Sequence, residues 1–264
     1  MIIAEIGWNF LGDLKLAKKM IISAKESGSN LIKFQLWDPR DLKPGPWDYD
    51  GRRKIYEKSF LNEKNFKDLY KFGRKNKVEI FASVFNLKSL NLLKKINNTY
   101  IKIPSSEAYN HKLIHEALQG FKTVFVSTGA LSFKELKSLS KFKKKKNFIP
   151  LHCVSSYPLN LDNANFEKFF MLKKIFKKVG YSGHYKGIDD ALFAISQNAT
   201  VVEKHFTTNN NLAGRDNKFA LLPSQLKFLN EYFLNHKKMI KKNKKGVLNC
   251  EKDVVKSYRG RWGS

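Results

Sequence analysis

Hydroxyl, amide and cationic side chains recur near the ends of the short apolar runs of this sequence. The set comprises Lys33, Gln35, Ser83, Lys102, Ser105, Ser127, Ser155, Tyr157 and Ser182. Ammonium groups and hydroxyl donors arranged together are what binds a carboxylate or a phosphate. A lysine buried without an anion is costly, so Lys33 and Lys102, which lie inside apolar runs, favour an anionic ligand. The pattern therefore predicts a site for a small, highly charged anion.

Two histidines, His184 and His205, end two consecutive apolar runs. Neighbouring strands of a parallel sheet lie about 5 Å apart, so both imidazoles could reach one ion. Two protein nitrogens leave several coordination positions for water and substrate, which is typical of a Lewis-acid metal site. We therefore predict that this pair binds a divalent metal ion.

The elements that must position these residues alternate β-rich runs with amphipathic segments. Strands are expected at Ile2–Ile6, Leu31–Leu36, Val78–Phe85, Tyr100–Ile103, Thr123–Ser127, Phe148–Val154, Val179–Ser182 and Thr200–His205. Apolar residues at helical spacing lie between them, and a last helix is expected from about Ser224 to Ile240. Eight such units predict an α/β protein with a single-domain (β/α)₈ barrel over residues 1–240, and an open doubly wound sheet is the alternative. In a barrel the polar residues above would converge at one mouth.

The composition is strongly basic, with 50 Lys and Arg against 23 Asp and Glu in 264 residues, a formal charge of +27. Only 7 of the cations are Arg, and they form no Arg-rich stripe with aromatic residues, so we interpret the excess as solvated helix faces. We expect no nucleic-acid partner. The absence of a long apolar run and the presence of 2 Cys predict a cytoplasmic protein without a membrane partner.

Several motifs together resemble the sialic acid synthase (N-acetylneuraminate synthase) family. They are Glu5-Ile6-Gly7-Trp8-Asn9, Lys33-Phe34-Gln35, Ser105-Ser106-Glu107, Ser127-Thr128-Gly129, Leu151 to Pro158, Gly180 to His184 and Glu203 to Thr207. The resemblance implies a (β/α)₈ barrel that condenses phosphoenolpyruvate with a 2-acylamino hexose, N-acetylmannosamine or a related sugar. The products would be a nine-carbon 2-keto-3-deoxy acid and phosphate. It also implies Mn²⁺ or Mg²⁺ as cofactor and a homodimer.

Three acidic residues, Glu5, Glu107 and Asp216, lie near the ends of predicted strands or on the loops that follow them. Glu107 follows the serine pair that should hold the anion, so we expect it to transfer a proton or steer water near the reacting carbons. Glu5 is a second candidate catalytic group and should hydrogen-bond the sugar together with Gln35 and Tyr157. Asp216 is expected to contact the sugar or a metal-bound water, and a purely structural role in a turn is the alternative. His205 completes the catalytic set.

Residues 241–264 are predicted to form a basic C-terminal tail, so the chain is expected to lack the antifreeze-like domain of many relatives. Arg259 and Arg261 stand beside aromatic residues in this tail. We expect one of them to reach a barrel mouth, in its own or a partner subunit, in place of the arginine from the missing domain; a frayed terminus is the alternative. Two other functions also stay open at this point: a non-catalytic sugar- or polyanion-binding barrel and a metal-dependent barrel hydrolase.

Overall fold

Eight parallel strands close into a barrel in the computed structural model, which describes residues 1–241 and 246–263. The strands are β1 (Ile2–Gly7), β2 (Leu31–Leu36), β3 (Glu79–Val84), β4 (Tyr100–Ile103), β5 (Thr123–Ser127), β6 (Phe148–Cys153), β7 (Gly180–Gly183) and β8 (Val202–His205). Each strand pairs with its neighbours in sequence, and β8 pairs with β1. The predicted (β/α)₈ barrel is therefore confirmed, and the open sheet is excluded. Strand limits differ from the expected ones by at most two residues.

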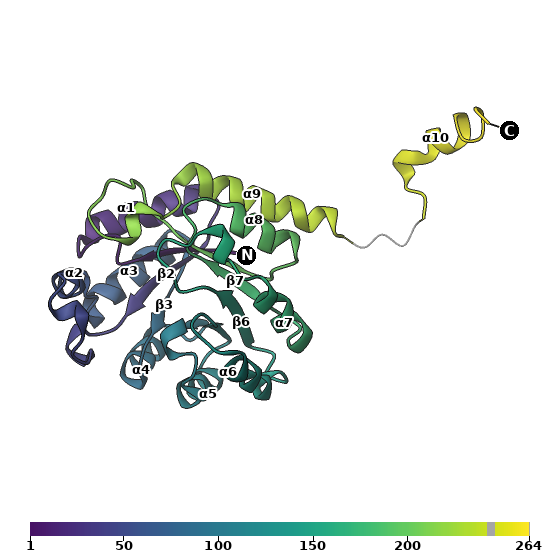
Figure 1. The fold of residues 1–264 in the computed structure, drawn as a ribbon. Coiled ribbons are helices and arrows are strands. Elements are labelled where there is room, and N and C mark those ends of the chain that lie inside the picture. Colours follow the sequence, from purple (N-terminus) through teal and green to yellow (C-terminus); the bar gives the residue numbers. More distant parts are fainter. Residues whose placement is uncertain (242–245, 264) are drawn as a thin grey trace.

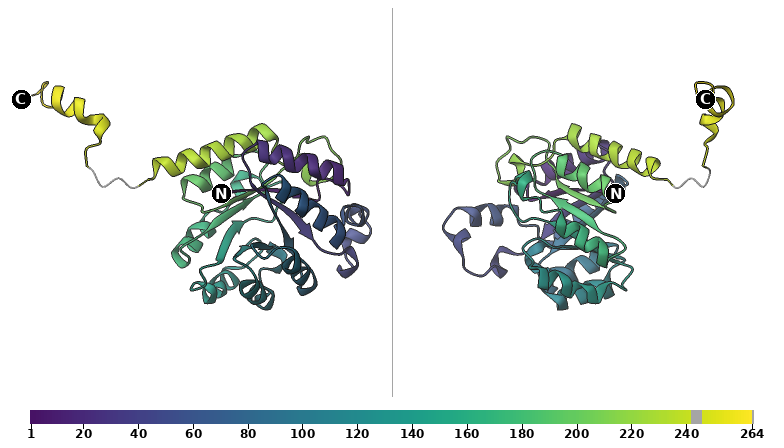
Figure 2. Two further views of the ribbon diagram at one scale, coloured as in Figure 1. Left: turned by 180° about the vertical axis from the view of Figure 1, so that it is seen from behind. Right: turned by 45° about the vertical axis from the view of Figure 1, so that its right-hand side comes forward.

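Helices surround the strands on the outside of the barrel (Figures 1 and 2). They are α1 (Leu14–Glu26), α2 (Arg52–Ser59), α3 (Glu63–Lys75), α4 (Leu87–Ile96), α5 (His111–Gly120), α6 (Phe133–Ser138), α7 (Glu167–Ile175), α8 (Asp189–Ser196) and α9 (Pro223–Met239). The side chain of Asp13 caps α1 by accepting hydrogen bonds from the backbone N–H groups of Lys15 and Leu16. The sequence reasoning missed α2, a short polar helix in the long segment between β2 and α3.

The interior of the barrel explains how the strands place the site. A separate apolar cluster fills its lower part, made of Ile3, Leu31, Phe81, Phe125, Ile149, Leu151 and Val201 with Tyr100 packed against it. Alternate residues of a strand point to the same face, so the next inward side chain lies two positions further on. Glu5 thus follows Ile3, Lys33 follows Leu31, and Lys102 follows Tyr100. The two-residue spacing therefore places a layer of polar side chains directly above a layer of apolar ones.

Beyond the barrel, the described residues 246–263 include a short 3₁₀ turn (Asn249–Glu251) and α10 (Lys252–Ser257), drawn apart from the barrel in Figure 1. Their side chains are exposed or half-exposed. The division of the chain at residue 240 stays a prediction. None of the described helices combines the length and apolar character needed to cross a membrane.

Candidate active site

A small polar cavity lies on the apolar floor at the carboxyl ends of the strands. Its volume is about 60 Å³, and every strand contributes to its wall or rim. The lining residues are Glu5, Lys33, Gln35, Ser83, Phe85, Lys102, Pro104, Ser105, Ser127, Cys153, Tyr157, Ser182, His184, Glu203 and His205. We call this the inner cavity. Eleven of the fourteen residues singled out from the sequence lie here, so the structure brings most of them together as expected of a barrel mouth.

Both lysines of the inner cavity form ion pairs with buried carboxylates. The Lys33 Nζ lies 2.8 Å from Glu5 Oε2 and donates to Ser83 Oγ at 2.7 Å. The Lys102 Nζ lies 2.8 and 3.0 Å from the two oxygens of Glu203, which also accepts from Ser182 Oγ at 3.0 Å. The expectation that these lysines would need a ligand as counter-ion was therefore incomplete, because the protein supplies the counter-ions itself.

The two carboxyl groups titrate differently because their surroundings differ. Burial raises the pKa of Glu5 to about 7, against the opposing attraction of Lys33. Burial also acts to raise the pKa of Glu203, but Lys102 and Lys33 outweigh it and hold this pKa at about 2. Near neutral pH, Glu203 is ionised while Glu5 can carry a proton. With Glu5 protonated, two lysines face one carboxylate and the inner cavity carries an excess of positive charge; with Glu5 ionised, the two lysines and the two carboxylates balance.

The histidine pair lies at the rim of the inner cavity, with ring centroids 5.5 Å apart. His184 Nδ1 bonds the Val154 carbonyl at 2.9 Å, which requires its proton on Nδ1 and leaves Nε2 as a free lone pair. The Nδ1 of His205 is buried and has no hydrogen-bond partner in the part of the chain that the structure describes, and it lies 3.8 Å from Asp216 Oδ2. Burial lowers the pKa of both imidazoles, that of His184 to about 4, so both are neutral as metal ligands must be.

A larger cavity of about 400 Å³ adjoins the inner one and opens outward. We call it the outer cavity. The two cavities share Gln35, Phe85, Pro104, Ser105, Tyr157 and His205, so His205 lies at their boundary. The outer cavity also contains the predicted residues Ser155 and Asp216. Asp216 accepts a hydrogen bond from the Trp8 indole N–H, and burial raises its pKa.

Serine hydroxyls and a glycine meet closely where the two cavities join. The backbone N–H of Gly129 donates to Ser105 Oγ at 3.1 Å. A Cβ at residue 129 would lie 2.4 Å from Ser155 Oγ and 2.7 Å from Ser105 Oγ, so only glycine fits without displacing these hydroxyls. The Ser127 hydroxyl nearby is buried without a partner, and it remains available for a ligand.

Glu107 lies in neither of these two cavities. It is half-buried in a 3₁₀ turn (Ser105–Glu107) and lines a third cavity of about 610 Å³ beside the outer one. Burial raises its pKa. Its expected role in proton transfer stays a prediction, whereas Glu5 lines the inner cavity beside Lys33. The arginines at the outer cavity are Arg52 and Arg215, whereas Arg259 and Arg261 line none of these three cavities.

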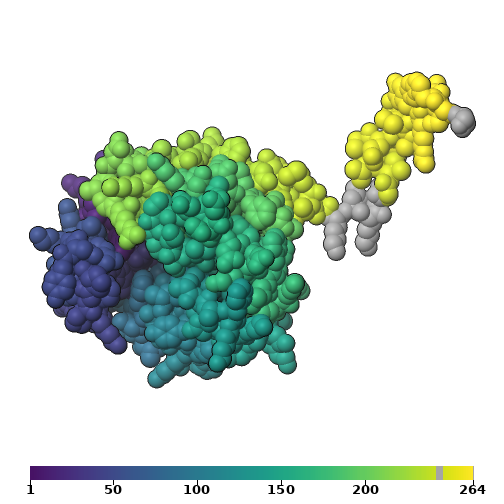
Figure 3. Space-filling view, in the orientation of Figure 1, coloured from purple at the N-terminus to yellow at the C-terminus, as the bar shows by residue number. Residues whose placement is uncertain are grey.

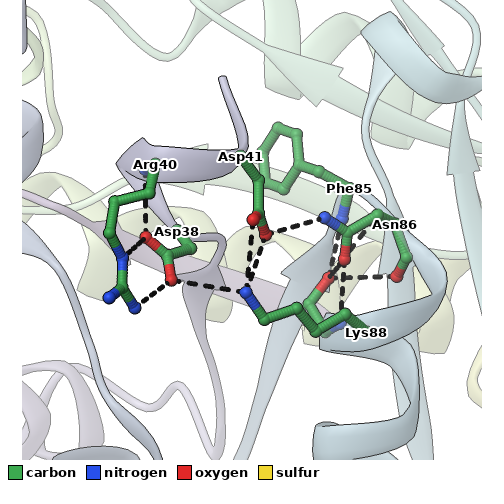
Figure 4. Close-up of polar contacts among 7 residues, drawn as sticks. Asp38, Arg40, Asp41, Phe85, Asn86 and Lys88 are labelled. Carbon is green, nitrogen blue, oxygen red and sulfur yellow. Dashed lines mark hydrogen bonds and ion pairs between the residues drawn. The ribbon is translucent and has the colours of Figure 1, made fainter. Parts of the chain in front are cut away.

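The segment between β2 and α3 forms one wall of the mouth. Polar contacts to the start of α4 anchor it (Figure 4): Lys88 Nζ lies 3.1 Å from Asp41 and 3.5 Å from Asp38, and Asn86 also bonds Asp41. Arg40 binds Asp38 through its backbone and guanidinium and keeps the pKa of that carboxyl low. In Figure 3 the blue surface around α2 stands beside the green loops with a recess between them.

Comparison with known proteins agrees with this geometry. Residues 20–245 match the profile of the NeuB family. The chain belongs to the NeuB family. A N,N'-diacetyllegionaminic acid synthase of Campylobacter jejuni is 33% identical over 246 residues, which are 87% of this chain and 74% of that protein. A N-acetylneuraminate-9-phosphate synthase of Drosophila melanogaster is 31% identical, over 89% of this chain and 68% of the relative.

Solved structures show the same barrel in NeuB-like proteins. The crystal structure of the N-acetylneuraminic acid synthetase of Leptospira borgpetersenii, in complex with citrate, matches with a TM-score of 0.86 and 33% identity, covering 98% of this chain and 92% of that one. This NeuB chain is thus similar to sugar-acid synthases in sequence and in fold. A truncated 3-deoxy-D-arabino-heptulosonate 7-phosphate synthase of Thermotoga maritima, with a TM-score of 0.64 and 14% identity, shares the fold.

Sequence reasoning missed the aromatic part of the site. Trp8, Tyr56 and Phe85 line the outer cavity, and Trp37 packs against them. Trp8 was visible as part of the first motif, but Trp37 and Tyr56 come from the segment after β2, and Phe85 follows β3. No spacing rule joins such residues before the barrel is closed.

Proposed function

We propose that this NeuB-family barrel condenses phosphoenolpyruvate with a 2-acylamino hexose to a nine-carbon 2-keto-3-deoxy acid and releases phosphate. The names of its relatives, which are synthases of sialic and legionaminic acids, support this choice of reaction. The observation that carries it is the pair of adjoining cavities: a small one at the floor that holds two buried lysines and a larger one above it, with His205 at their boundary and His184 beside it in the inner cavity.

The inner cavity has the chemistry of a phosphoenolpyruvate site. Lys33 and Lys102 supply cationic donors, and the Ser83, Ser105, Ser127 and Ser182 hydroxyls surround them. A carboxylate and a phosphate require several charge-assisted hydrogen bonds, which these groups can give. The relative from Leptospira borgpetersenii was crystallised in complex with citrate, a small polycarboxylate, and this also supports an anion site in such barrels.

The histidine pair fits the divalent metal of the proposed reaction. His184 has its Nε2 free, and the Nδ1 of His205 is a buried nitrogen without a partner. Among the described residues no group of three or more His, Cys, Asp or Glu side chains is arranged around an ion, so substrate and water would complete the coordination. When bound, the metal would polarise the sugar aldehyde. Mn²⁺ or Mg²⁺ as the metal, a homodimer and a cytoplasmic location stay predictions.

The residues then have distinct tasks in a balanced sequence of bonds. C3 of phosphoenolpyruvate forms a bond to the aldehyde carbon, whose oxygen becomes a hydroxyl. Water adds at C2, and the proton it releases ends on the oxygen of the former aldehyde. The C2–O bond to phosphate then breaks as the ketone forms, and the proton of the C2 hydroxyl leaves with the phosphate. Glu5, with its pKa of about 7, is placed to accept the proton of the attacking water. Lys33 and Lys102 stabilise the departing phosphate.

Phosphate release tests this function directly. The protein is incubated with phosphoenolpyruvate, Mn²⁺ and a panel of acylamino hexoses, and both phosphate and the mass of the new acid are measured. Phosphate release that depends on one of the sugars and yields the condensed acid supports the proposal. The matched control is the double variant His184→Ala, His205→Ala, which should keep the fold and lose turnover. Binding of a sugar without phosphate release would favour a non-catalytic barrel instead, and phosphate release without a sugar would favour a hydrolase.

A further inference from the structure

Exposed lysines gather at the end of the barrel opposite the mouth, where the helices end and the strands begin. The connections around β4, β5, β6 and β7 at this end, residues 94–99, 119–122, 141–147 and 173–179, contain no Asp or Glu. Cations near the carboxyl end of a helix interact favourably with its dipole, so lysines are stable here. We call the exposed lysines at 94–95, 122, 143–146, 173–174 and 177–178 the basic face.

Hydrogen bonds hold these connections side by side. The Asn147 amide donates to the carbonyls of Leu118 and Phe121 at 3.0 and 2.9 Å, which joins the connection before β6 to the one before β5. The backbone N–H of Lys122 donates to the Asn98 carbonyl at 2.9 Å and joins the connections before β5 and β4. The lysines are scattered in the sequence, and the closed barrel brings them together.

A row of buried aromatic rings lies between the two longest lysine runs. The ring centroid of Phe148 lies 5.4 Å from that of Phe142 and 5.3 Å from that of Phe176. Phe142 precedes the lysines at 143–146, and Phe176 stands between the lysine pairs of the connection before β7. All three rings are buried while the lysines around them are exposed. The two runs are therefore adjacent on a packed apolar support.

Carboxylates of the protein do not neutralise the basic face. None of its lysines takes part in an ion pair among the described residues. Like charges that lie close together repel one another, and an anionic surface opposite them would relieve this repulsion. The basic face is thus suited to a negatively charged partner.

The chemistry of the basic face fits an anionic lipid bilayer better than a nucleic acid or a protein. It contains no Arg, whose planar fork binds phosphates and base edges in a bidentate way, and its aromatic rings are buried and cannot stack on bases. Its residues line none of the three cavities described above, so they offer no pocket there for an anchoring side chain of a protein. Clustered lysine charges suffice for anionic headgroups, which require no fixed geometry.

We propose that the basic face binds reversibly to the surface of an anionic bilayer. The mouth lies at the opposite ends of the strands, so the bound protein keeps its cavities open to the aqueous phase. The inference does not depend on the proposed function, because no residue of the basic face lines the active site. It departs from the expectation of no membrane partner, which was drawn before the barrel showed that the lysines share one face.

Sedimentation with lipid vesicles tests the inference. The full chain is mixed with vesicles of phosphatidylcholine, with and without about 30% phosphatidylserine, in about 0.1 M NaCl. The wild type should bind the anionic vesicles and not the neutral ones. A lysine near such a surface strengthens binding roughly fivefold. The variant Lys143→Gln, Lys144→Gln, Lys145→Gln, Lys146→Gln should therefore lower the partition coefficient at least tenfold.

A matched variant at the mouth end controls for net charge. Lys15, Lys64, Lys112 and Lys134 are exposed and are each the second residue of their helix, α1, α3, α5 and α6. Replacing these four with Gln changes the charge equally and should leave the partition coefficient within threefold of the wild type. Equal losses in the two variants, or equal binding of the wild type to neutral and anionic vesicles, would overturn the inference.

Two additions keep the result decisive. Circular dichroism checks the fold, and if the variant of residues 143–146 does not fold, Lys177→Gln with Lys178→Gln is compared with Lys15→Gln with Lys64→Gln; the first pair should then lose at least fivefold more binding. A short DNA duplex is added as competitor at the same concentration of phosphate groups as the lipid. Retained vesicle binding supports the inference, and complete displacement by the duplex would show a nucleic-acid surface instead.

Discussion

Removal of the buried ammonium group of Lys204 should strongly destabilise the barrel and loosen the histidine pair. The Lys204 Nζ lies 2.9 Å from each oxygen of Asp190 and donates to the Tyr185 carbonyl at 2.7 Å. Both charged side chains are almost completely buried. Lys204 directly precedes His205, and Tyr185 directly follows His184. This one side chain therefore ties together the two strand ends that carry the proposed metal ligands.

The magnitude follows from the burial of the ion pair. Lys204→Met leaves Asp190 with the Tyr181 hydroxyl and the Ala191 N–H as its donors among the described residues. Breaking a buried pair in this way costs about 3–5 kcal/mol, whereas replacing both partners with apolar residues is often nearly neutral. A domain of this size changes its Tm by roughly 2–4 °C per kcal/mol, so Lys204→Met should lower the Tm by about 6–20 °C.

A double-mutant cycle provides the assay. Thermal unfolding is measured for Lys204→Met, Asp190→Leu and the double variant, and Mn²⁺ binding is measured by titration for each folded protein. The double variant should be at least about 2 kcal/mol more stable than the sum of the single losses predicts. Mn²⁺ affinity should fall roughly 10- to 100-fold in Lys204→Met, as expected when the support of metal ligands is removed. A single variant within 1 kcal/mol of wild type, or additive losses, would refute this reasoning.

Three further predictions concern the inner cavity and the buried histidines. Lys102→Ala should raise the KM for phosphoenolpyruvate about 10- to 100-fold, because a charge-assisted hydrogen bond contributes about 1.5–3 kcal/mol. Steady-state kinetics measure this KM, and an unchanged value would show that Lys102 does not bind phosphoenolpyruvate. Gly129→Ala should lower kcat/KM at least tenfold in the same assay, since its Cβ would displace Ser105 and Ser155; wild-type activity would contradict the close fit. Burial lowers the pKa of His152 to about 4, so the unfolded state binds more protons between pH 6.5 and 4, and stability should fall by about 3 kcal/mol over that window as the pH is lowered. Urea unfolding of the wild type and of His152→Gln at pH 7 and pH 4.5 tests this. If the free energy of unfolding depends on pH equally in the two proteins, the prediction is wrong.

The barrel itself was predictable because each strand carries its own local signal. β2, β4 and β5 were placed at their observed limits, since an apolar run bounded by turn residues defines them. The polar layer was predictable for the same reason: Lys33 and Lys102 each lie two positions beyond an inward apolar residue. A spacing of two residues can be seen in a sequence. In a closed barrel, the residues with this spacing on all strands come together as one apolar layer and one polar layer above it.

Contacts between distant segments could not be predicted in this way. The sequence did not show that Glu203 would take the charge of Lys102, because the two residues lie 101 positions apart and meet only across the barrel. The same holds for Trp8 and Tyr56, whose stacking depends on how the segment after β2 folds back over the mouth. Their types were informative, but their partners depend on tertiary packing.

The fate of the bridging oxygen of phosphoenolpyruvate tests the central claim most directly. Phosphoenolpyruvate labelled with ¹⁸O between C2 and phosphorus is incubated with the protein, Mn²⁺ and the best acceptor of the panel, and the released phosphate is analysed by mass spectrometry. Condensation with cleavage of the C2–O bond predicts that the label appears in phosphate, together with one equivalent of the nine-carbon acid. Unlabelled phosphate, or labelled phosphate without that acid, would contradict the proposed reaction.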